Sequence, residues 1–401
     1  MAAESWEQVP LGAVVTEIRN GTSPVESQTW TGVQMLGLGC LTLNGFQPRQ
    51  LKHAPSASLG QHTAVLRDGD LLVSRANTRE LVGVAGIYRD IGTPCIYPDL
   101  MMRLRSSEEY VPEFLEIVLR APKARRRIAA LAQGTSDSMV KISGAALRRV
   151  PVPVIPMREQ QRIVELVDAV SAQERAIEDS ITKLRRVRQG ALLAAMAPLG
   201  GNESLKGWAR MPLKDIVPTA EYGVSEALDR DSRGIAVLRM NNLESGRPEL
   251  SDLRYSPVPL PARLELSHGD VLFNRTNSID HIGKSAMWRG EIPKASFASY
   301  LVRINPDASR LIPEYLVEWL MHPLVRQRVR SISTVAVQQV NVNPTRLREL
   351  VIDMPIDLGE QRRIVDSLYA CDAQISGEQE ELRKLRALKT GLVDDLLSGK
   401  A

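Results

Sequence analysis

The sequence predicts an α+β protein with two similar globular units, each followed by a long helix. The first observation is a direct repeat within the 401 residues, because "GDLLVSRANTRELVGVAGIY" at 69–88 is matched by "GDVLFNRTNSIDHIGKSAMW" at 269–288. The second is that each copy mixes short apolar runs with apolar residues at helical spacing. The third is a heptad pattern near the end of each copy. A chain of this length exceeds one ordinary core, so two or more domains are expected.

The repeat extends over almost the whole chain. "VPEFLEIVL" at 111 matches "IPEYLVEWL" at 312, and "EQQRIVELV" at 159 matches "EQRRIVDSL" at 360. The offset stays between 200 and 202, which indicates a duplicated unit rather than a solenoid. We therefore predict globular units at 1–155 and 208–356, helical regions at 156–198 and 357–401, and a flexible linker at 199–207.

The globular units are predicted to combine strands and short helices. "DLLVSR" and "DVLFNR" follow Gly-Asp turns and are typical of strands, so Asp70 and Asp270 are interpreted as turn formers rather than catalytic acids. A helix is expected from the proline at 112, ending at Gly134, with a counterpart from 313. Further prolines at 122 and 323 predict that each is two shorter helices.

Heptad spacing predicts that the helical regions pair as an intramolecular coiled coil. Both helices exceed the usual length of about 8–20 residues, and each has an equal partner in the chain, which disfavours helices lying only on their own units. About 38 residues would give a helix roughly 57 Å long. The predicted apolar positions are Ile163, Val167, Val170, Ile177, Ile181, Leu184, Ala191 and Ala195, then Ile364, Leu368, Cys371, Ile375, Leu382, Leu385, Leu392 and Leu396.

Four polar residues, Glu174, Arg188, Glu378 and Lys389, interrupt the heptads. One interpretation is that their side chains reach solvent from the edge of the seam. The other is that they contact helices of partner subunits. The sequence leaves both open.

Composition narrows the functional classes. A net charge of +4 and a pI near 9.0 mildly favour a polyanionic ligand, although a solvated, salt-bridged surface gives the same totals. The sequence contains no run of 18 apolar residues, so no membrane span is predicted. The N-terminus does not resemble a secretory signal. Cys40, Cys95 and Cys371 lack paired spacing, which disfavours a zinc site or disulfides. We predict a cytoplasmic protein.

Motifs for catalysis are not found in the sequence. It contains neither a phosphate-binding loop with lysine nor the tetrapeptide of adenine methyltransferases, and no acidic cluster typical of nucleases repeats. The prediction is therefore a chain without catalytic residues, metal or cofactor of its own.

Arginine and asparagine residues after the repeated strands suggest DNA binding. Arg75 and Arg275 could contact guanine, and Asn77 and Asn277 adenine, although such residues can equally brace their own loops. Segments where the copies diverge are better candidates for base reading: "LGLGCLTLNGFQ" against "LRMNNLESGRPE", "TRELVG" against "SIDHIG", and "QGTSDSMVKIS" against "TVAVQQVNVN". Phosphate contacts, or a merely solvated face, are expected on the helices at 123–127 and 326–330. The predicted DNA contacts are Arg75, Asn77, Arg79, Lys123, Arg125, Arg126, Arg127, Lys141, Arg239, Asn241, Asn242, Asn274, Arg275, Asn277, Gln338, Asn341 and Asn343.

"LRMNNLESGRPELSDLRY", "GDVLFNRTNSIDHIGKSAMW" and "EQRRIV" before a heptad helix resemble the specificity subunits of type I restriction–modification systems. The resemblance covers essentially the whole chain, although "QGTSDSMVKISGAALRRV" in the first copy departs from the pattern. It implies two target recognition domains of the DNA-methylase specificity type, joined by helices that pack antiparallel. It also implies a bipartite, asymmetric target in double-stranded DNA, with one half-site per domain.

The same resemblance implies partners. Two modification subunits would dock on the helices and bring two restriction subunits, and S-adenosylmethionine, ATP and Mg²⁺ would belong to these partners, not to this chain. Three alternatives remain open: a methylation-only complex, a scaffold that binds proteins, and a self-contained methyltransferase, which the missing motifs oppose. The predicted subunit-interface residues are Ile163, Val167, Val170, Glu174, Arg188, Ile364, Leu368, Ile375, Glu378 and Lys389.

Overall fold

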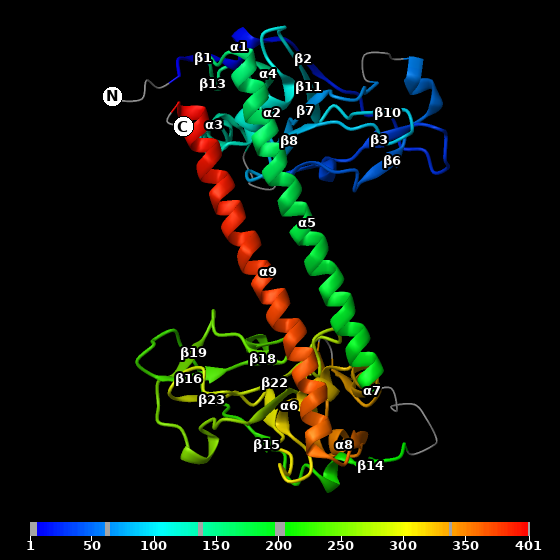
Figure 1. The fold of residues 1–401 in the computed structure, drawn as a ribbon, viewed down its shortest axis with the longest axis vertical. Helices are drawn as coiled ribbons and strands as arrows, with labels where there is room; N and C mark the ends of the chain where they lie inside the picture. Colours follow the sequence, from blue (N-terminus) through cyan, green and yellow to red (C-terminus); the bar gives the residue numbers. More distant parts are fainter. Residues whose placement is uncertain (1–5, 61–64, 135–138, 197–204, 337–338, 400–401) are drawn as a thin grey trace. The chain divides into compact units, whose positions relative to one another are not determined.

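The structure is a computed structural model that describes residues 6–60, 65–134, 139–196, 205–336 and 339–399 (Figure 1). The chain divides into two compact units. The first unit comprises Met1–Glu178 and Glu380–Ala401, and the second comprises Asp179–Gln379. Each contains a globular part, here called its head, and portions of two long helices. The predicted α+β architecture of two domains joined by long helices is confirmed.

Two long helices run without interruption through the division between the units (Figure 1). α5 (Met157–Ala195) has 39 residues and α9 (Leu358–Ser398) has 41. α5 begins in the first unit and ends in the second, whereas α9 does the reverse. Of the helices in the described ranges, none combines the length and apolar character that a membrane crossing requires.

The first head is built on an antiparallel four-stranded sheet beside a three-stranded sheet. The larger sheet has the order β2 (Val15–Asn20), β11 (Met101–Ser106), β7 (Leu71–Ser74), β9 (Ala85–Ile87). The smaller has the order β10 (Cys95–Ile96), β3 (Gln34–Leu36), β6 (Leu51–His53). Two-stranded pairs are β1 (Gln8–Pro10) with β13 (Pro151–Pro153), β4 (Leu41–Thr42) with β5 (Gly45–Phe46), and β8 (Ala76–Asn77) with β12 (Val140–Lys141). The helices are α1 (Leu11–Val14), α2 (Pro112–Arg120), α3 (Pro122–Leu131) and α4 (Gly144–Leu147).

The second head repeats this topology, as the duplication predicts. Its four-stranded sheet is β15 (Glu221–Tyr222), β24 (Leu301–Arg303), β20 (Val271–Asn274), β22 (Ser285–Met287), and its three-stranded sheet is β19 (Arg254–Ser256), β16 (Ile235–Leu238), β23 (Ala295–Phe297). β14 (Trp208–Pro212) pairs with β27 (Val351–Pro355), and β17 (Leu243–Glu244) with β18 (Arg247–Pro248). A further sheet has the order β21 (Thr276–Asn277), β26 (Gln339–Asn341), β25 (Thr334–Ala336). The helices are α6 (Pro313–Met321), α7 (Pro323–Ser331) and α8 (Pro344–Arg348).

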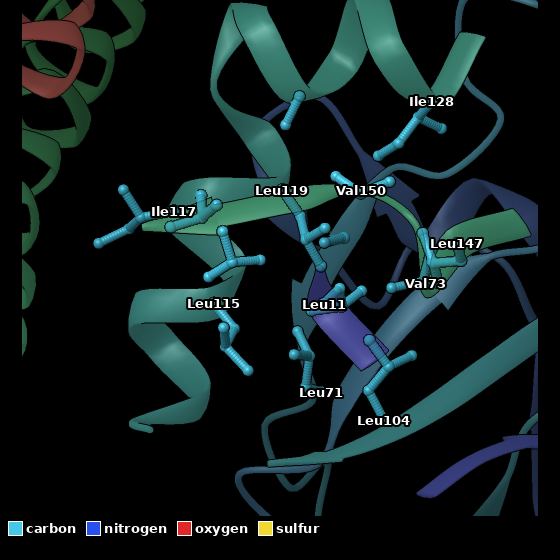
Figure 2. Packing of buried hydrophobic residues seen from close by; sticks show 14 of the residues in the cluster. Leu11, Leu71, Val73, Leu104, Leu115, Ile117, Leu119, Ile128, Leu147 and Val150 are labelled. Atoms are coloured by element: carbon cyan, nitrogen blue, oxygen red, sulfur yellow. The ribbon is translucent and has the colours of Figure 1, made fainter. Parts of the chain in front are cut away.

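The core of each head lies between its larger sheet and its two consecutive helices. In the first head, Leu115 and Leu119 of α2 and Ile128 of α3 lie beside Leu71 and Val73 of β7 (Figure 2). α2 ends before Pro122 and α6 ends before Pro323, so the predicted division of each helical segment is confirmed. Proline disfavours helical backbone in the residue before it, which forces the turn between the two helices.

A buried glutamine holds each long helix on its head. The Gln160 Oε1 accepts the N–H of Val111 at 3.0 Å, and its Nε2 donates to the carbonyls of Glu109 and Ile155 at 2.9 and 2.8 Å. Gln361 makes the same three bonds, to Ile312, Arg310 and Pro355. Both side chains are 0% exposed. The repeated "EQ" therefore joins the first turn of the long helix to the start of α2 or α6.

Each head core also receives apolar residues from both long helices. Ile163 and Val167 near the start of α5 and Val393 near the end of α9 belong to the core of the first unit. Leu192 and Met196, with Val365 and Leu368, belong to that of the second. The heptad prediction differs by one position here, because Leu192 and Val393 are buried where Ala191 and Leu392 were expected. An α-helix drifts from a strict heptad, and next to the head the buried face turns toward the head.

We expect Gln160→Leu to destabilise the first unit by about 1–3 kcal/mol, because it leaves a buried amide and two carbonyls without partners. Hydrogen exchange should accelerate over residues 109–117 and stay unchanged over 310–318. Gln161→Leu is the matched control, since Gln161 is exposed. Equal exchange in the two variants would contradict the role given to Gln160.

Candidate nucleic-acid interface

An arginine follows the same strand in each head and is held by its backbone between two other segments. The Arg75 N–H donates to Leu100 O at 2.8 Å, and Arg75 O accepts the N–H of Ile142 at 2.9 Å. In the second head, Arg275 N–H donates to Tyr300 O at 3.0 Å and Arg275 O accepts from Val342 at 2.8 Å. The two arginines therefore occupy equivalent, well-defined positions.

Short strand pairs bring the divergent segments beside these arginines. Asn77 lies opposite Val140 in the β8–β12 pair, and Asn277 lies opposite Val340 in the β21–β26 pair. Two of the segments predicted to read bases, "QGTSDSMVKIS" and "TVAVQQVNVN", are thus next to the arginine-bearing loops. Residues 135–138 of the first, and Gln338 of the second, lie outside the described residues.

The loops after these arginines are held on α3 and α7. Arg125 donates from Nη1 to Val82 O at 2.7 Å and from Nη2 to Glu80 O at 2.8 Å. Its counterpart Arg326 donates to Asp280 O at 2.9 Å. Burial lowers the pKa of both guanidinium groups. Arg125, predicted to contact phosphate, thus uses two guanidinium nitrogens to brace its own loop.

A glycine lets each loop approach its helix closely. Gly83 has φ +70°, and a Cβ built there would lie 2.2 Å from the Ile128 Cγ2. Gly283 has φ +76°, and a Cβ would lie 2.9 Å from the Val329 Cγ1. A residue with a side chain would be strained in backbone and contact alike. The loops therefore share one fixed conformation in the two heads.

The asparagines after the arginines partly serve their own turns. Asn77 Oδ1 accepts the N–H of Thr78 at 2.9 Å, and Asn277 Oδ1 accepts that of Ser278 at 2.8 Å. Both side chains are half-buried. A bidentate contact to adenine needs the amide oxygen as well as the amide nitrogen. Each oxygen would have to accept a second hydrogen bond.

Three other predicted residues brace the loop after β16. Asn242 is 1% exposed, donates to Glu249 O and Asp252 O, and accepts from the backbone of Arg239. Arg239 pairs with the Asp252 carboxylate at 2.8 Å. Asn274 is 0% exposed and donates to Met240 O at 3.2 Å. Asn242 and Asn274 are therefore buried inside the head in this conformation, with their amides directed at its own backbone.

The remaining predicted DNA contacts lie at the surface or half-buried. In the second head, Asn341 accepts from the Thr276 hydroxyl at 2.6 Å, and Asn343 caps α8 through the N–H of Thr345. Arg79 donates to Ala129 O at 3.4 Å from an exposed position. The exposed members are Arg79, Lys123, Arg126, Arg127, Lys141, Asn241 and Asn343.

The polar residues of the long helices have partners within the chain. In the first unit, Lys389 pairs with Glu174 at 2.9 Å, and Arg386 pairs with Glu178. The numbers fall along α9 as they rise along α5, so this helix pair is antiparallel. Glu174 and Lys389 are only 15% and 19% exposed, which places the ion pair within the seam.

The second unit has its own polar group in the helix pair. Arg188 contacts Asp372 at 2.5 Å and Glu318 of α6 at 2.9 Å, while Glu378 accepts from the Ser180 hydroxyl at 3.2 Å. Burial raises the pKa of Glu318, and the charge of Arg188 opposes that rise. All four interrupting residues therefore make polar contacts within the chain, and their role toward partner subunits stays a prediction.

The predicted apolar interface residues are likewise covered by the chain itself. Ile163, Val167, Leu368 and Ile375 are buried. Val170 and Ile364 are half-buried. These positions are therefore occupied by packing within the chain.

Sequence reasoning did not select two exposed tyrosines beside Arg275. Tyr222 is 48% and Tyr300 46% exposed, and the Arg275 guanidinium lies 5.2 Å from the centre of the Tyr222 ring. The first copy has no tyrosine at either position, and that difference is the signal that could have identified them. No group of residues suited to bind a metal occurs in the described part of the chain.

Known proteins similar to this chain are specificity subunits of type I restriction enzymes. A provisionally named subunit, MjaX, from Methanocaldococcus jannaschii is 27% identical over 48% of this chain and 45% of its own length. The EcoKI subunit of Escherichia coli K12 is 26% identical over 47% and 42%. The EcoBI subunit of Escherichia coli is 24% identical over 68% and 62%. The matches thus span about half the length of these relatives. No protein-family model matches the chain.

Two solved structures share the fold over nearly the whole chain. One comes from a study of the structural basis of complex assembly and conformational transition of the type I restriction–modification system. It has a TM-score of 0.64 at 19% identity, and the match covers 99% of this chain and 98% of that one. The other is the S subunit of a type I system from M. genitalium, with a TM-score of 0.55 at 14% identity, covering 99% and 97%. The resemblance to type I specificity subunits is confirmed.

We expect Arg188→Met to destabilise the second unit by roughly 2–3 kcal/mol near pH 8, because Glu318 and Asp372 lose their cation. A carboxyl whose folded pKa is raised binds its proton more readily in the folded state, so stability falls as pH rises. Without Arg188 the pKa of Glu318 rises further. The difference in free energy of unfolding between the parent chain and the variant should therefore become smaller as pH falls toward about 5. Urea denaturation at several pH values measures this, with Arg186→Met, an exposed neighbour, as control.

Proposed function

We propose that this chain is the DNA-recognition subunit of a type I restriction–modification complex and binds a bipartite, asymmetric target. One observation carries the proposal: the two heads share a scaffold and an arginine position, but they differ in the segments around that arginine. Two heads with the same scaffold but different surfaces around the arginine are suited to bind two half-sites of different sequence. The similarity to specificity subunits supports it.

The proposed DNA contacts fall into two classes. Exposed basic residues such as Lys123, Arg126, Arg127 and Lys141 would neutralise phosphates and set the position of the head on the duplex. Residues around Arg75 and Arg275 would contact base edges. Arg125 would support the first group indirectly by holding the loop of residues 78–83.

The long helices would separate the half-sites and bind the partners. Half-sites one turn of DNA apart are about 34–36 Å between centres, which helices of roughly 58 Å can span. We propose two modification subunits on the outer helix faces and, through them, two restriction subunits. S-adenosylmethionine, ATP and Mg²⁺ would be bound by these partners, in the cytoplasm, and the present chain would supply no catalytic residue. A complex without restriction subunits would use the same heads.

Exchanging one head should change one half-site only. Replacing residues 1–155 with the same region of a related subunit should alter one half of the methylated motif, because each head folds around its own core. The measurement is the methylome of cells that express the chimera with its modification subunit, and the reciprocal exchange of 208–356 is the control. A change in both halves would contradict one half-site per head, and the absence of any methylated motif in the parent would contradict the proposal itself.

Lengthening the helices should lengthen the spacer. Four residues inserted into both α5 and α9 add about 6 Å, equal to about 2 base pairs at roughly 3.4 Å each. A four-residue insertion is a stutter that a helix pair can absorb. The same methylome assay should then report unchanged half-sites with a longer spacer. An unchanged spacer in a stable complex would show that the helices do not set it.

A further inference from the structure

The second head places an arginine between tyrosines at one end of its four-stranded sheet. β20 ends at Asn274, directly before Arg275, and β15 ends at Tyr222. β24, which lies between these strands and runs antiparallel to both, begins directly after Tyr300. The strand ends therefore bring Tyr222, Arg275 and Tyr300 to one edge of the sheet.

The Arg275 guanidinium is held beside an aromatic ring, and its terminal nitrogens donate no hydrogen bond to a described residue. It lies over the Tyr222 ring at 5.2 Å, and the ring restricts its plane. Its Nε is buried without a hydrogen-bond partner, and no hydrogen bond from its terminal nitrogens to a described residue occurs. Both tyrosine side chains are about half exposed, at 48% and 46%, so this edge faces solvent. Such a group has two parallel N–H donors ready for a planar acceptor.

The first head lacks this arrangement. Arg75 donates from Nη1 to Asp99 O at 3.2 Å, and Asn20 and Leu100 occupy the positions of Tyr222 and Tyr300. Asn20 and Tyr222 are equivalent because they pair with Met102 and Val302, which match in the repeat. Leu100 and Tyr300 are equivalent because the carbonyl of each accepts the backbone N–H of the arginine in its own head. The Arg75 guanidinium is thus bonded to the backbone of Asp99, whereas the terminal nitrogens of Arg275 make no hydrogen bond to any residue that the structure describes.

We propose that Arg275 reads a guanine in the half-site of the second head, with Tyr222 as its positioning residue. Guanine presents two adjacent acceptors, O6 and N7, in the major groove, and a flat guanidinium meets both at once. The inference rests on the proposed function. It adds the base that is read, the residue that reads it and the difference between the heads.

The test uses the full chain with its modification subunit. The parent methylome defines the two half-sites, and duplexes randomised at one position at a time in the second half-site serve as probes. Arg275→Met keeps a side chain of similar length beside the ring but has no N–H donor for guanine. We expect discrimination for one guanine to fall about 10- to 100-fold, with the rest of the motif unchanged. Tyr222→Leu should weaken the same position less, and Tyr222→Phe should restore it.

Arg230→Met, at an exposed arginine of the same head, is the matched control and should leave the second half-site intact. Thermal denaturation of each variant monitors folding. If Arg275→Met is folded and the complex methylates the parent motif with full discrimination, Arg275 does not read a base and the inference is wrong, while the proposed function stands. If relaxation appears at an adenine or pyrimidine, the assignment to guanine is wrong. A parent without a bipartite motif would reject the proposed function instead.

Discussion

A single buried glutamine side chain ties the first turn of each long helix to its head through three hydrogen bonds. Gln160 and Gln361 each satisfy one backbone N–H and two carbonyls that would otherwise be buried without partners. Because the bonds join the first turn of the helix to the start of α2 or α6, they fix the direction in which the helix leaves the head. An apolar residue of similar size would fill the space but could not supply the bonds. Along that direction, Ile163 and Val167 of α5 lie in the core of the first unit, and Val365 and Leu368 of α9 lie in that of the second.

Ion pairs between α5 and α9 join the two long helices in each unit. Arg188 and Lys389 are equivalent positions of the repeat, yet their acidic partners, Asp372 and Glu174, are not equivalent. The duplication has therefore kept a basic residue near the end of each helix and changed where its acid lies. Partly buried ion pairs add little net stability, but a wrong register would leave a buried charge unpaired. We therefore expect these ion pairs to act mainly by disfavouring other alignments of the two helices.

The two heads share the support of their arginine-bearing loops but differ in the surroundings of the arginine. Arg125 and Arg326 brace equivalent loops, and Gly83 and Gly283 allow both loops to lie against a helix. On this common support, the first head ties Arg75 to the backbone and the second leaves Arg275 over Tyr222. A duplicated protein can vary the surface around this arginine in this way without altering its core.

The duplication, the fold class, the two long helices and the breaks before Pro122 and Pro323 could all be predicted from the sequence, because repeats, apolar periodicity and proline act over short stretches of chain. The sequence also identified the arginine-bearing loops. Tertiary structure alone decided that Arg125 braces a loop, that Asn242 and Asn274 are buried, and that Leu192 and Val393 face the cores. It alone joined Glu174 to Lys389, 215 residues away, and Arg275 to Tyr222. Such pairings depend on which surfaces meet when the chain folds, and local spacing does not encode that.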